Sequence, residues 1–134
     1  MNGKNNVVLT DTAGGQPMIF VHGFGCDQTM WRHVTPQFAD THLIVTYDLT
    51  GMGHSDHSAY DPQRYDDLEA HADDLLAIIA AHELQEAVIV GHSVGASLAL
   101  LSANRAPEKV ARLVLVSPSP RFLEDEDGGY HGGF

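Results

Sequence analysis

The chain has 134 residues, of which 43% are hydrophobic and 19% are charged, and its net charge is −11. This composition is typical of one globular domain and excludes a disordered segment. The negative charge disfavours nucleic acids and anionic membranes as partners, because clusters of Lys and Arg bind both. No apolar run approaches the roughly 20 residues of a transmembrane helix, and no apolar segment follows Met1 as in a secretory signal. We therefore expect a cytoplasmic protein.

Short β-branched segments alternate with segments of helical periodicity, which predicts βαβ units and a mostly parallel sheet with flanking helices. The predicted strands are 7–9, 18–22, 43–47, 87–90 and 111–116. A turn is predicted over 14–17, a short helix capped by Asp27 over 27–31, and a Gly-rich loop over 48–55. Residues 96–105 form a further predicted helix, which ends before Pro107.

A longer helix is predicted after residue 66, where Asp66 and Glu69 resemble a capping box. Apolar residues recur on one face at helical spacing. The opposite face carries charges that we expect to be solvated. The apolar positions are Leu68, Ala72, Leu75, Leu76 and Ile79, and the charged ones are Glu69, Asp73, Asp74 and Glu83.

Residues 91–95 form a G-x-S-x-G motif directly between a predicted strand and a predicted helix. This motif is characteristic of the serine nucleophile elbow in α/β-hydrolases. Strand and helix approach closely on either side of such a turn, which leaves room only for glycine at Gly91 and Gly95. The turn exposes the Ser93 hydroxyl at a helix N-terminus, where free N–H groups favour a developing anion. Ser93 is therefore the predicted nucleophile.

A second motif, His22-Gly23-Phe24-Gly25, closes the strand at 18–22, where this fold places its oxyanion loop. The backbone N–H groups of Phe24 and Val94 are the predicted oxyanion-hole donors. Loss of one such donor costs about 3 kcal/mol of transition-state stabilisation. His92 is adjacent to Ser93 on the turn and should point away from it, so we do not expect it to be the base.

Other motifs fit the sequence less well. Gly23 and Gly51 each begin a possible dinucleotide fingerprint, but the third glycine of each is missing. His54 and His57 lack further ligands for a metal, and Cys26, the single cysteine, has no evident activating group. These motifs therefore predict neither a dinucleotide site, nor a metal site, nor a cysteine nucleophile.

The whole set of motifs resembles the RsbQ-like group of α/β-hydrolases, which is related to a bacterial stress-response regulator and to plant karrikin and strigolactone receptors. The resemblance implies a hydrophobic pocket over Ser93, a helical lid, a small apolar substrate or ligand, and no metal ion or organic cofactor. The segments that carry it are 22–31, 47–49, 51–55, 91–96, 117–122 and 132–134.

The resemblance also implies a lid, further strands, a triad Asp, a triad His and a final helix after the strand at 111–116. We therefore expect residues 1–134 to be the N-terminal part of one α/β-hydrolase domain, truncated after that strand and inactive alone. Asp125, Asp127 and His131 follow Ser93 in the order that a triad requires, but a Gly-rich acidic tail gives them no scaffold. An open edge should remain at the last strand, which predicts oligomerisation or poor solubility.

Three functions remain open at this stage. The first is ester hydrolysis through an acyl-Ser93 intermediate, with the base supplied from outside this chain. The second is ligand sensing with a signalling protein as partner. The third is an inactive fragment or a subunit that is complemented by a separate C-terminal chain.

Overall fold

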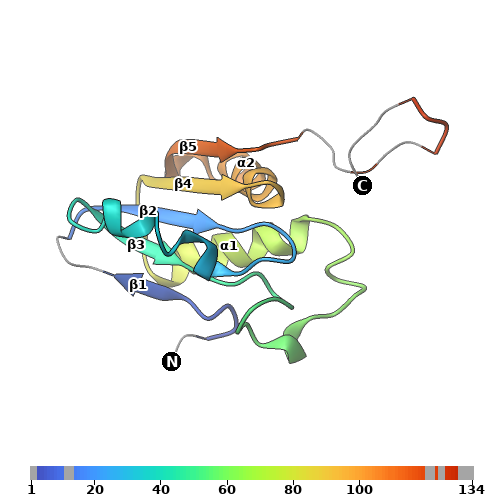
Figure 1. Ribbon diagram of the computed structural model, residues 1–134, viewed down its shortest axis with the longest axis horizontal. Coiled ribbons are helices and arrows are strands. Elements are labelled where there is room, and N and C mark those ends of the chain that lie inside the picture. Colours follow the sequence, from blue (N-terminus) through green and yellow to red (C-terminus); the bar gives the residue numbers. More distant parts are fainter. Residues whose placement is uncertain (1–2, 11–13, 120–122, 124–125, 130–134) are drawn as a thin grey trace.

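The computed structural model describes residues 3–10, 14–119, 123 and 126–129. Within these residues five strands form one sheet in the order β1-β3-β2-β4-β5 (Figure 1). β1 pairs antiparallel with β3, and the other neighbours pair in parallel. The strands are β1 (Val8–Thr10), β2 (Gln16–Val21), β3 (His42–Thr46), β4 (Ala87–His92) and β5 (Val110–Val116). The predicted α/β architecture is therefore confirmed.

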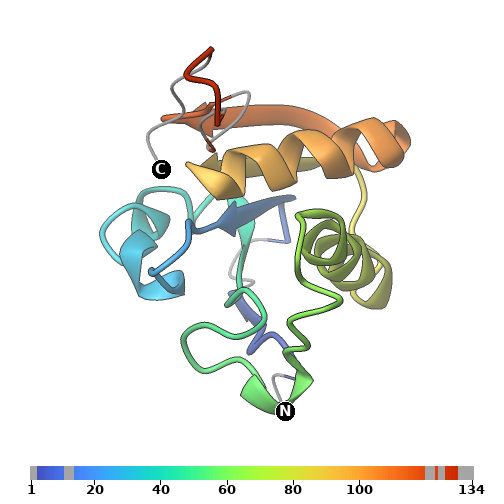
Figure 2. The same ribbon diagram turned by 90° about the vertical axis from the view of Figure 1, so that its right-hand side faces the viewer.

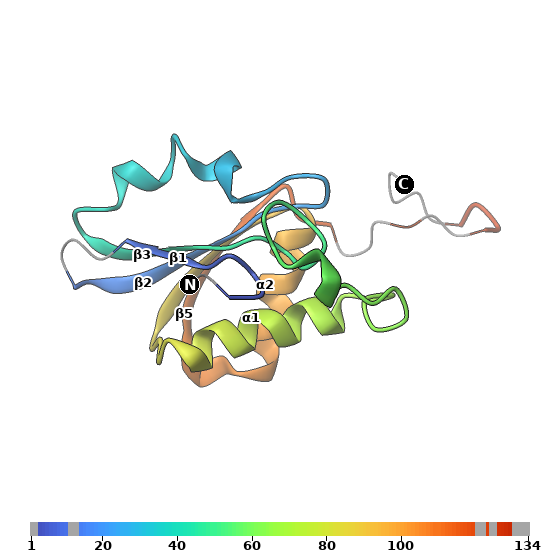
Figure 3. The same ribbon diagram turned by 90° about the horizontal axis from the view of Figure 1, so that it is seen from below.

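Two α-helices cover one face of the sheet, α1 (Glu69–Ala81) and α2 (Val94–Arg105) (Figure 3). The segment between β2 and β3 lies over the other face and contains two short 3-10 helices, η1 (Gln28–Trp31) and η2 (Thr35–Gln37). Two more 3-10 helices are η3 (His57–Ala59) and η4 (Pro107–Lys109). No helix in the described part of the chain is long and apolar enough to span a membrane.

Each face of the sheet has its own apolar core. The larger cluster lies between the sheet and the two α-helices and includes Ile19, Val45 and Leu75, all fully buried. On the opposite face, Phe20 packs against Trp31 of η1 with ring centroids 5.1 Å apart. Burial of each large side chain contributes about 1.5–3 kcal/mol. Because both faces of the sheet are covered, apolar residues run continuously along the central strands, as expected for such strands.

Element boundaries differ from the sequence prediction in places. β2 begins at Gln16, inside the predicted turn, because Pro17 pairs only with β3 and needs no N–H on its other side. α2 begins at Val94, directly after Ser93. The predicted capping pair is wrong: Asp66 does not cap α1, and Asp67 instead accepts from the Glu69 N–H at 2.9 Å. Asp27 caps as predicted, but the helix that follows it is a 3-10 helix.

The solvated acidic face predicted for α1 is wrong at one position. Asp74 is 5% exposed, and its carboxylate accepts hydrogen bonds from Lys4 Nζ at 2.7 Å, Thr50 Oγ1 at 2.7 Å and Tyr65 Oη at 2.9 Å. Burial alone would lower the pKa of Lys4, but its hydrogen bonds to Asp74 and Tyr65 outweigh burial and raise that pKa. This ion pair therefore joins the N-terminal segment to α1.

β5 is an edge strand among the described residues, since it pairs only with β4. Leu113 and Leu115 pack on the helix-covered side, whereas Val114 and Val116 are 46% and 40% exposed. The open edge expected at the last strand is confirmed for the described part of the chain, and it carries exposed apolar side chains on one face.

Candidate active site

Ser93 lies at the junction of β4 and α2 with φ 58° and ψ −116°. A non-glycine residue rarely adopts this positive φ, and such strain costs about 1–3 kcal/mol where the surroundings enforce it. Here the enforcement is visible, because the Ser93 N–H donates to Val116 O at 2.9 Å. The sharp strand-to-helix turn that the motif predicts is therefore present, with half-buried Ser93 at its apex.

The two motif glycines permit the close approach on either side of this turn. A Cβ on Gly91 would collide with the backbone carbonyl of Gly95, and a Cβ on Gly95 would collide with the carbonyl of Val21. Both obstacles are backbone atoms in the sheet and helix, which cannot rotate aside. The steric reason predicted for Gly91 and Gly95 is therefore confirmed.

The loop after β2 packs directly against the elbow. A Cβ on Gly23 would lie 3.4 Å from Ser93 Cβ and 3.3 Å from His92 O, so the backbone of this loop touches the turn. Phe24 follows with its side chain 49% exposed, and its ring centroid lies 5.8 Å from that of buried His71 on α1. The loop that carries Phe24 therefore lies beside the elbow that carries Val94, at the end of the neighbouring strand.

The N–H groups in the first turn of α2 have no helical carbonyl one turn earlier that could accept their hydrogen bonds. Val94 is its first residue and is buried. A helix N-terminus favours negative charge nearby, by about 0.3–1 kcal/mol at an exposed site. Electrostatics at the elbow therefore suit an anion beside Ser93.

His22 immediately precedes the loop at 23–25 and is fully buried. Its Nδ1 lies 2.7 Å from Gly23 O, and its Nε2 accepts from the Leu49 N–H at 2.9 Å. Burial lowers the pKa of His22, which the Gly23 hydrogen bond and the charges of Asp48 and Asp27 only partly oppose. Nε2 accepts the hydrogen bond from Leu49 only when it is unprotonated, so the arrangement requires the neutral imidazole, with both nitrogens engaged.

The loop that follows β3 is organised by the buried Asp48 carboxylate. Asp48 accepts from Gln28 N at 2.9 Å, from His54 N at 2.9 Å and from Asn6 Nδ2 at 3.0 Å. Its own N–H donates to Asn5 O at 2.8 Å. The predicted Gly-rich loop is thus joined by hydrogen bonds both to the N-terminal segment and to the start of η1.

Sequence reasoning missed the supporting roles of His22 and Asp48. Each is a polar residue at the carboxyl end of an otherwise apolar strand, where loops of a parallel sheet gather. That position is the signal from which they could have been found. His92, which we did not expect to be the base, is half-buried, and its Nδ1 has no hydrogen-bond partner among the described residues.

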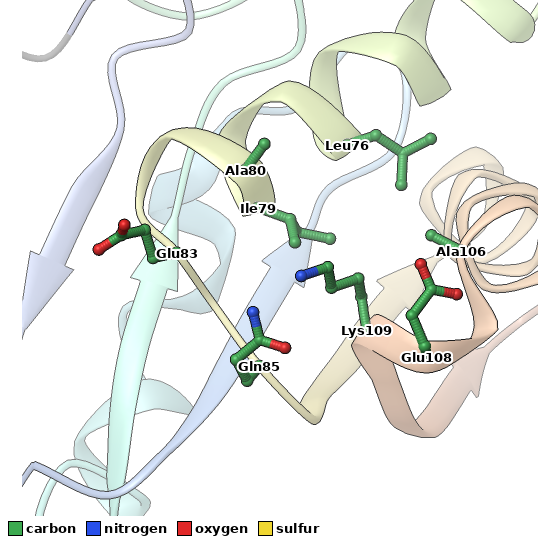
Figure 4. Close-up of a pocket in the computed structure, with 8 residues that line it drawn as sticks. All are labelled: Leu76, Ile79, Ala80, Glu83, Gln85, Ala106, Glu108 and Lys109. Carbon is green, nitrogen blue, oxygen red and sulfur yellow. The ribbon is translucent and has the colours of Figure 1, made fainter.

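Two cavities in the described part of the chain lie away from Ser93. A cavity of about 530 Å³ lies between the end of α1 and η4, lined by Ile79, Gln85 and Lys109 among others (Figure 4). Since Gln85 precedes β4 and Ser93 follows it, this cavity is at the opposite end of the strand. A second, of about 520 Å³, adjoins Lys4 and Arg64. Neither is lined by Ser93, so neither is the predicted pocket over the nucleophile.

Two of the three tail residues considered for a triad, Asp125 and His131, lie outside the described residues. Asp127 is exposed and accepts from the Gly129 N–H at 2.9 Å. In the described part of the chain, no three His, Cys, Asp or Glu side chains form a group that could hold a metal ion. Cys26 is half-buried, with its N–H bonded to Gly23 O at 3.2 Å.

Comparison with known proteins agrees with this geometry. Residues 16–133 match the sequence profile of the alpha/beta hydrolase fold. The chain is 40% identical over 129 residues to Strigolactone esterase D14 of Arabidopsis thaliana, covering 96% of this chain and 47% of that protein. It is 38% identical over 122 residues to the Karrikin insensitive 2 receptor CA of Petunia hybrida, covering 91% and 44%.

A solved structure of a hydrolase from Oleispira antarctica superposes with a TM-score of 0.88 at 32% identity, covering 99% of this chain and 48% of that one. The chain thus spans about half the length of the relatives that it matches.

Proposed function

This chain belongs to the α/β-hydrolase fold family, and we propose that it carries the nucleophile and oxyanion elements of a serine hydrolase of the carboxylic-ester type. Ser93 is the nucleophile, and the backbone N–H groups of Phe24 and Val94 are the oxyanion donors. The observation that carries this proposal is the positive φ of Ser93 between β4 and α2, with Gly23 packed against it. The substrate is a small apolar ester, and no metal or organic cofactor takes part.

In the proposed reaction, Ser93 Oγ attacks the ester carbonyl carbon and passes its proton to a base. The carbonyl oxygen becomes an anion held by the two N–H groups, and the C–O bond to the alcohol then breaks as the alcohol takes that proton. Water attacks the acyl-Ser93 carbonyl in the same way and releases the acid. Each donor contributes about 3 kcal/mol to the transition state.

The base and its orienting carboxylate come from outside these 134 residues in this proposal. His22 cannot act as the base, because its two nitrogens are engaged with Gly23 and Leu49. A serine hydroxyl without a base is a weak nucleophile, so the chain alone is inactive. The half-length coverage of the relatives supports a missing second half of the domain.

A fluorophosphonate probe tests the proposal, because it labels activated serines. The full-length protein is expected to be labelled at Ser93, the 134-residue chain alone is not, and Ser93→Ala abolishes labelling. Ser97→Ala, in the same helix four residues further on, serves as the matched control and keeps labelling. An unlabelled full-length protein, or labelling that survives Ser93→Ala, rules the proposal out.

Ligand sensing is the second candidate, and the observation that favours it is the likeness to a protein named as a karrikin-insensitivity receptor. In that case a small apolar ligand occupies the site over Ser93 and a signalling protein binds the liganded form. Calorimetric titration of the Ser93→Ala variant with strigolactone or karrikin separates the two candidates. Binding without turnover in the unmodified protein favours sensing, and rapid turnover favours the hydrolase.

Complementation is the third candidate, supported by the half-length coverage. Here a separate C-terminal chain supplies the triad Asp and His along β5. Mixing the two chains is expected to restore labelling at Ser93, whereas the unmixed chains stay unlabelled. Labelling that does not change on mixing excludes this arrangement.

A further inference from the structure

The hydrogen bonds of His22 determine which of its nitrogens carries the proton. The Leu49 N–H can only donate, so Nε2, 2.9 Å away, must be the acceptor. Nδ1 therefore carries the hydrogen and donates to Gly23 O at 2.7 Å. One neutral tautomer satisfies both bonds at once, and neither the other tautomer nor the cation can do so.

The acceptor of this bond is one end of a peptide group whose other end is the Phe24 N–H. The peptide unit is planar, and in its trans form the N–H points opposite to the C=O. When His22 holds the Gly23 carbonyl toward the protein interior, the Phe24 N–H is turned the other way, out of the core. Gly23 O also accepts from the Cys26 N–H at 3.2 Å, so the fully buried His22 side chain and the turn to Cys26 together set the direction of the proposed oxyanion donor.

The second ring nitrogen of His22, Nε2, accepts from a Leu49 N–H that is itself held in place. Leu49 is 1% exposed and follows Asp48, whose carboxylate accepts three hydrogen bonds from separate segments. The Leu49 N–H therefore cannot shift without disturbing this network. The continuous path runs from Asp48 through Leu49 and His22 to Gly23, which touches Ser93.

We propose that His22 is a positioning residue that aims the Phe24 N–H at the oxyanion through its Nδ1–H bond to Gly23 O. This inference rests on the proposed hydrolase function. It assigns His22 a role in transition-state stabilisation and none in proton transfer. The acidic groups near the ring are Asp48 and Asp27, and buried His71 is the neighbouring titratable group on α1.

A matched pair of variants separates the two hydrogen bonds. In His22→Asn the side-chain amide occupies the place of Nδ1 and can still donate to Gly23 O. In His22→Gln the amide reaches the place of Nε2, keeps the Leu49 contact and loses the donor to Gly23. On the full-length protein we expect His22→Gln to lower kcat for ester hydrolysis at least tenfold with little change in KM, because removal of an oxyanion donor typically costs about 10²–10³ in kcat.

His22→Asn is expected to recover most of that loss, and His33→Asn, at an exposed histidine, serves as the control with unchanged kinetics. Equal kcat values for His22→Gln, His22→Asn and the unmodified protein overturn the inference. So does a loss that appears in KM with kcat unchanged. An inactive unmodified protein that fluorophosphonate also fails to label contradicts the proposed function instead, so the two failures are distinguishable.

Nitrogen-15 NMR of the imidazole tests the tautomer in the unmodified protein, even where the variants fail to fold. Nδ1 is expected to have the chemical shift of a protonated ring nitrogen and Nε2 that of an unprotonated one at neutral pH. The reverse pattern, or a pattern averaged between tautomers, contradicts the proposed role.

Discussion

The Ser93 backbone N–H donates a 2.9 Å hydrogen bond to the carbonyl of Val116, the last residue of β5. The candidate elbow is therefore fastened to the edge strand of the sheet among the described residues. Any event that pulls β5 away from β4 also releases the constraint on the Ser93 backbone. Association of chains through the β5 edge and the backbone geometry of Ser93 are therefore linked by this one hydrogen bond.

The exposed edge leads to a first prediction about the 134-residue chain produced alone. We expect concentration-dependent oligomers, because β5 offers unpaired backbone groups beside Val114 and Val116. A Val114→Lys/Val116→Lys double variant should shift the chain toward monomer, since lysines on an edge strand oppose strand addition. Sedimentation velocity over a range of concentrations measures this. Val34→Lys, at a similarly exposed valine, is the control and should leave the oligomers unchanged. A monomeric unmodified chain contradicts the prediction.

Asp74 and Asp73 provide a second prediction, because these neighbours on α1 have opposite environments. Asp74→Asn breaks a mostly buried ion pair with Lys4 and should lower the free energy of unfolding by about 2–4 kcal/mol. We expect a loss near the lower end of this range, because the Lys4 side chain is 33% exposed. Asp73 is 47% exposed and pairs with Arg105 at 2.6 Å, so Asp73→Asn should cost about 0–1 kcal/mol. Urea unfolding measures both, and equal losses would show that Asp74 is solvated after all.

A third prediction concerns Gly95. A Gly→Ala change inside an ordinary helix stabilises it by about 1 kcal/mol. At Gly95 the sign is reversed, because the new methyl group collides with the carbonyls of Val21 and His22. We expect Gly95→Ala to destabilise the fold by about 1–3 kcal/mol or more. Leu100→Ala, at a 45% exposed position on the same helix, is the control for helix packing and should have a small effect. Stabilisation by Gly95→Ala in urea unfolding would refute the close approach.

The buried histidines give a fourth prediction, about pH. Burial lowers the pKa of both His22 and His71 below the ordinary value of 6.5. For each histidine, the pH range between its folded-state pKa and its unfolded-state pKa is one in which the unfolded chain binds more protons than the folded chain. The free energy of unfolding therefore rises with pH in that range. The full contribution is present above about pH 6.5 and is lost as the pH falls through the folded-state values. Urea unfolding at a series of pH values measures the slope.

His71→Phe isolates the share of His71 in that slope. The variant keeps an aromatic ring between Phe24 and Tyr65 and removes the titration. The slope below pH 6.5 should become shallower, whereas His33→Phe, at an exposed residue, should leave it unchanged. For His71, burial is the main cause of the lowered pKa, the charge of Asp74 opposes it and the charge of Lys4 adds to it. A slope unaffected by His71→Phe would assign the pH dependence to other groups.

Much of the fold could be predicted because local signals agreed with the tertiary structure. The apolar segments at 18–22, 43–47 and 87–90 lie within or beside β2, β3 and β4, since buried parallel strands need no alternation. The elbow was predictable because all of its steric requirements lie within one five-residue motif, in which no side chain larger than that of glycine fits at 91 and 95.

Long-range partners were not predictable from local pattern. Asp74 occupies a position on α1 that a helical wheel assigns to solvent, yet Lys4, Tyr65 and Thr50 surround it from three other segments. His22 entered the prediction only as the first residue of the His22–Gly25 motif, and its hydrogen bond to Leu49, 27 positions away, had no local signal. Periodicity describes which face of an element is apolar, but it contains no information on which distant polar group will meet a buried charge.

The N-terminal segment accepts hydrogen bonds from residues that are distant in the sequence. The donors are the Asp48 N–H to Asn5 O, the Asp56 N–H to Lys4 O and Gln28 Nε2 to Asn6 O. During synthesis, Lys4 and Asn5 leave the ribosome long before Asp48, Asp56 and Asp74 are made. Docking of this segment therefore has to follow the synthesis of those residues, and it completes the hydrogen bonds around Asp48 and Gln28. A fluorophore attached next to Lys4 would consequently report on the loop at 48–56, and a bulky tag there would disturb it.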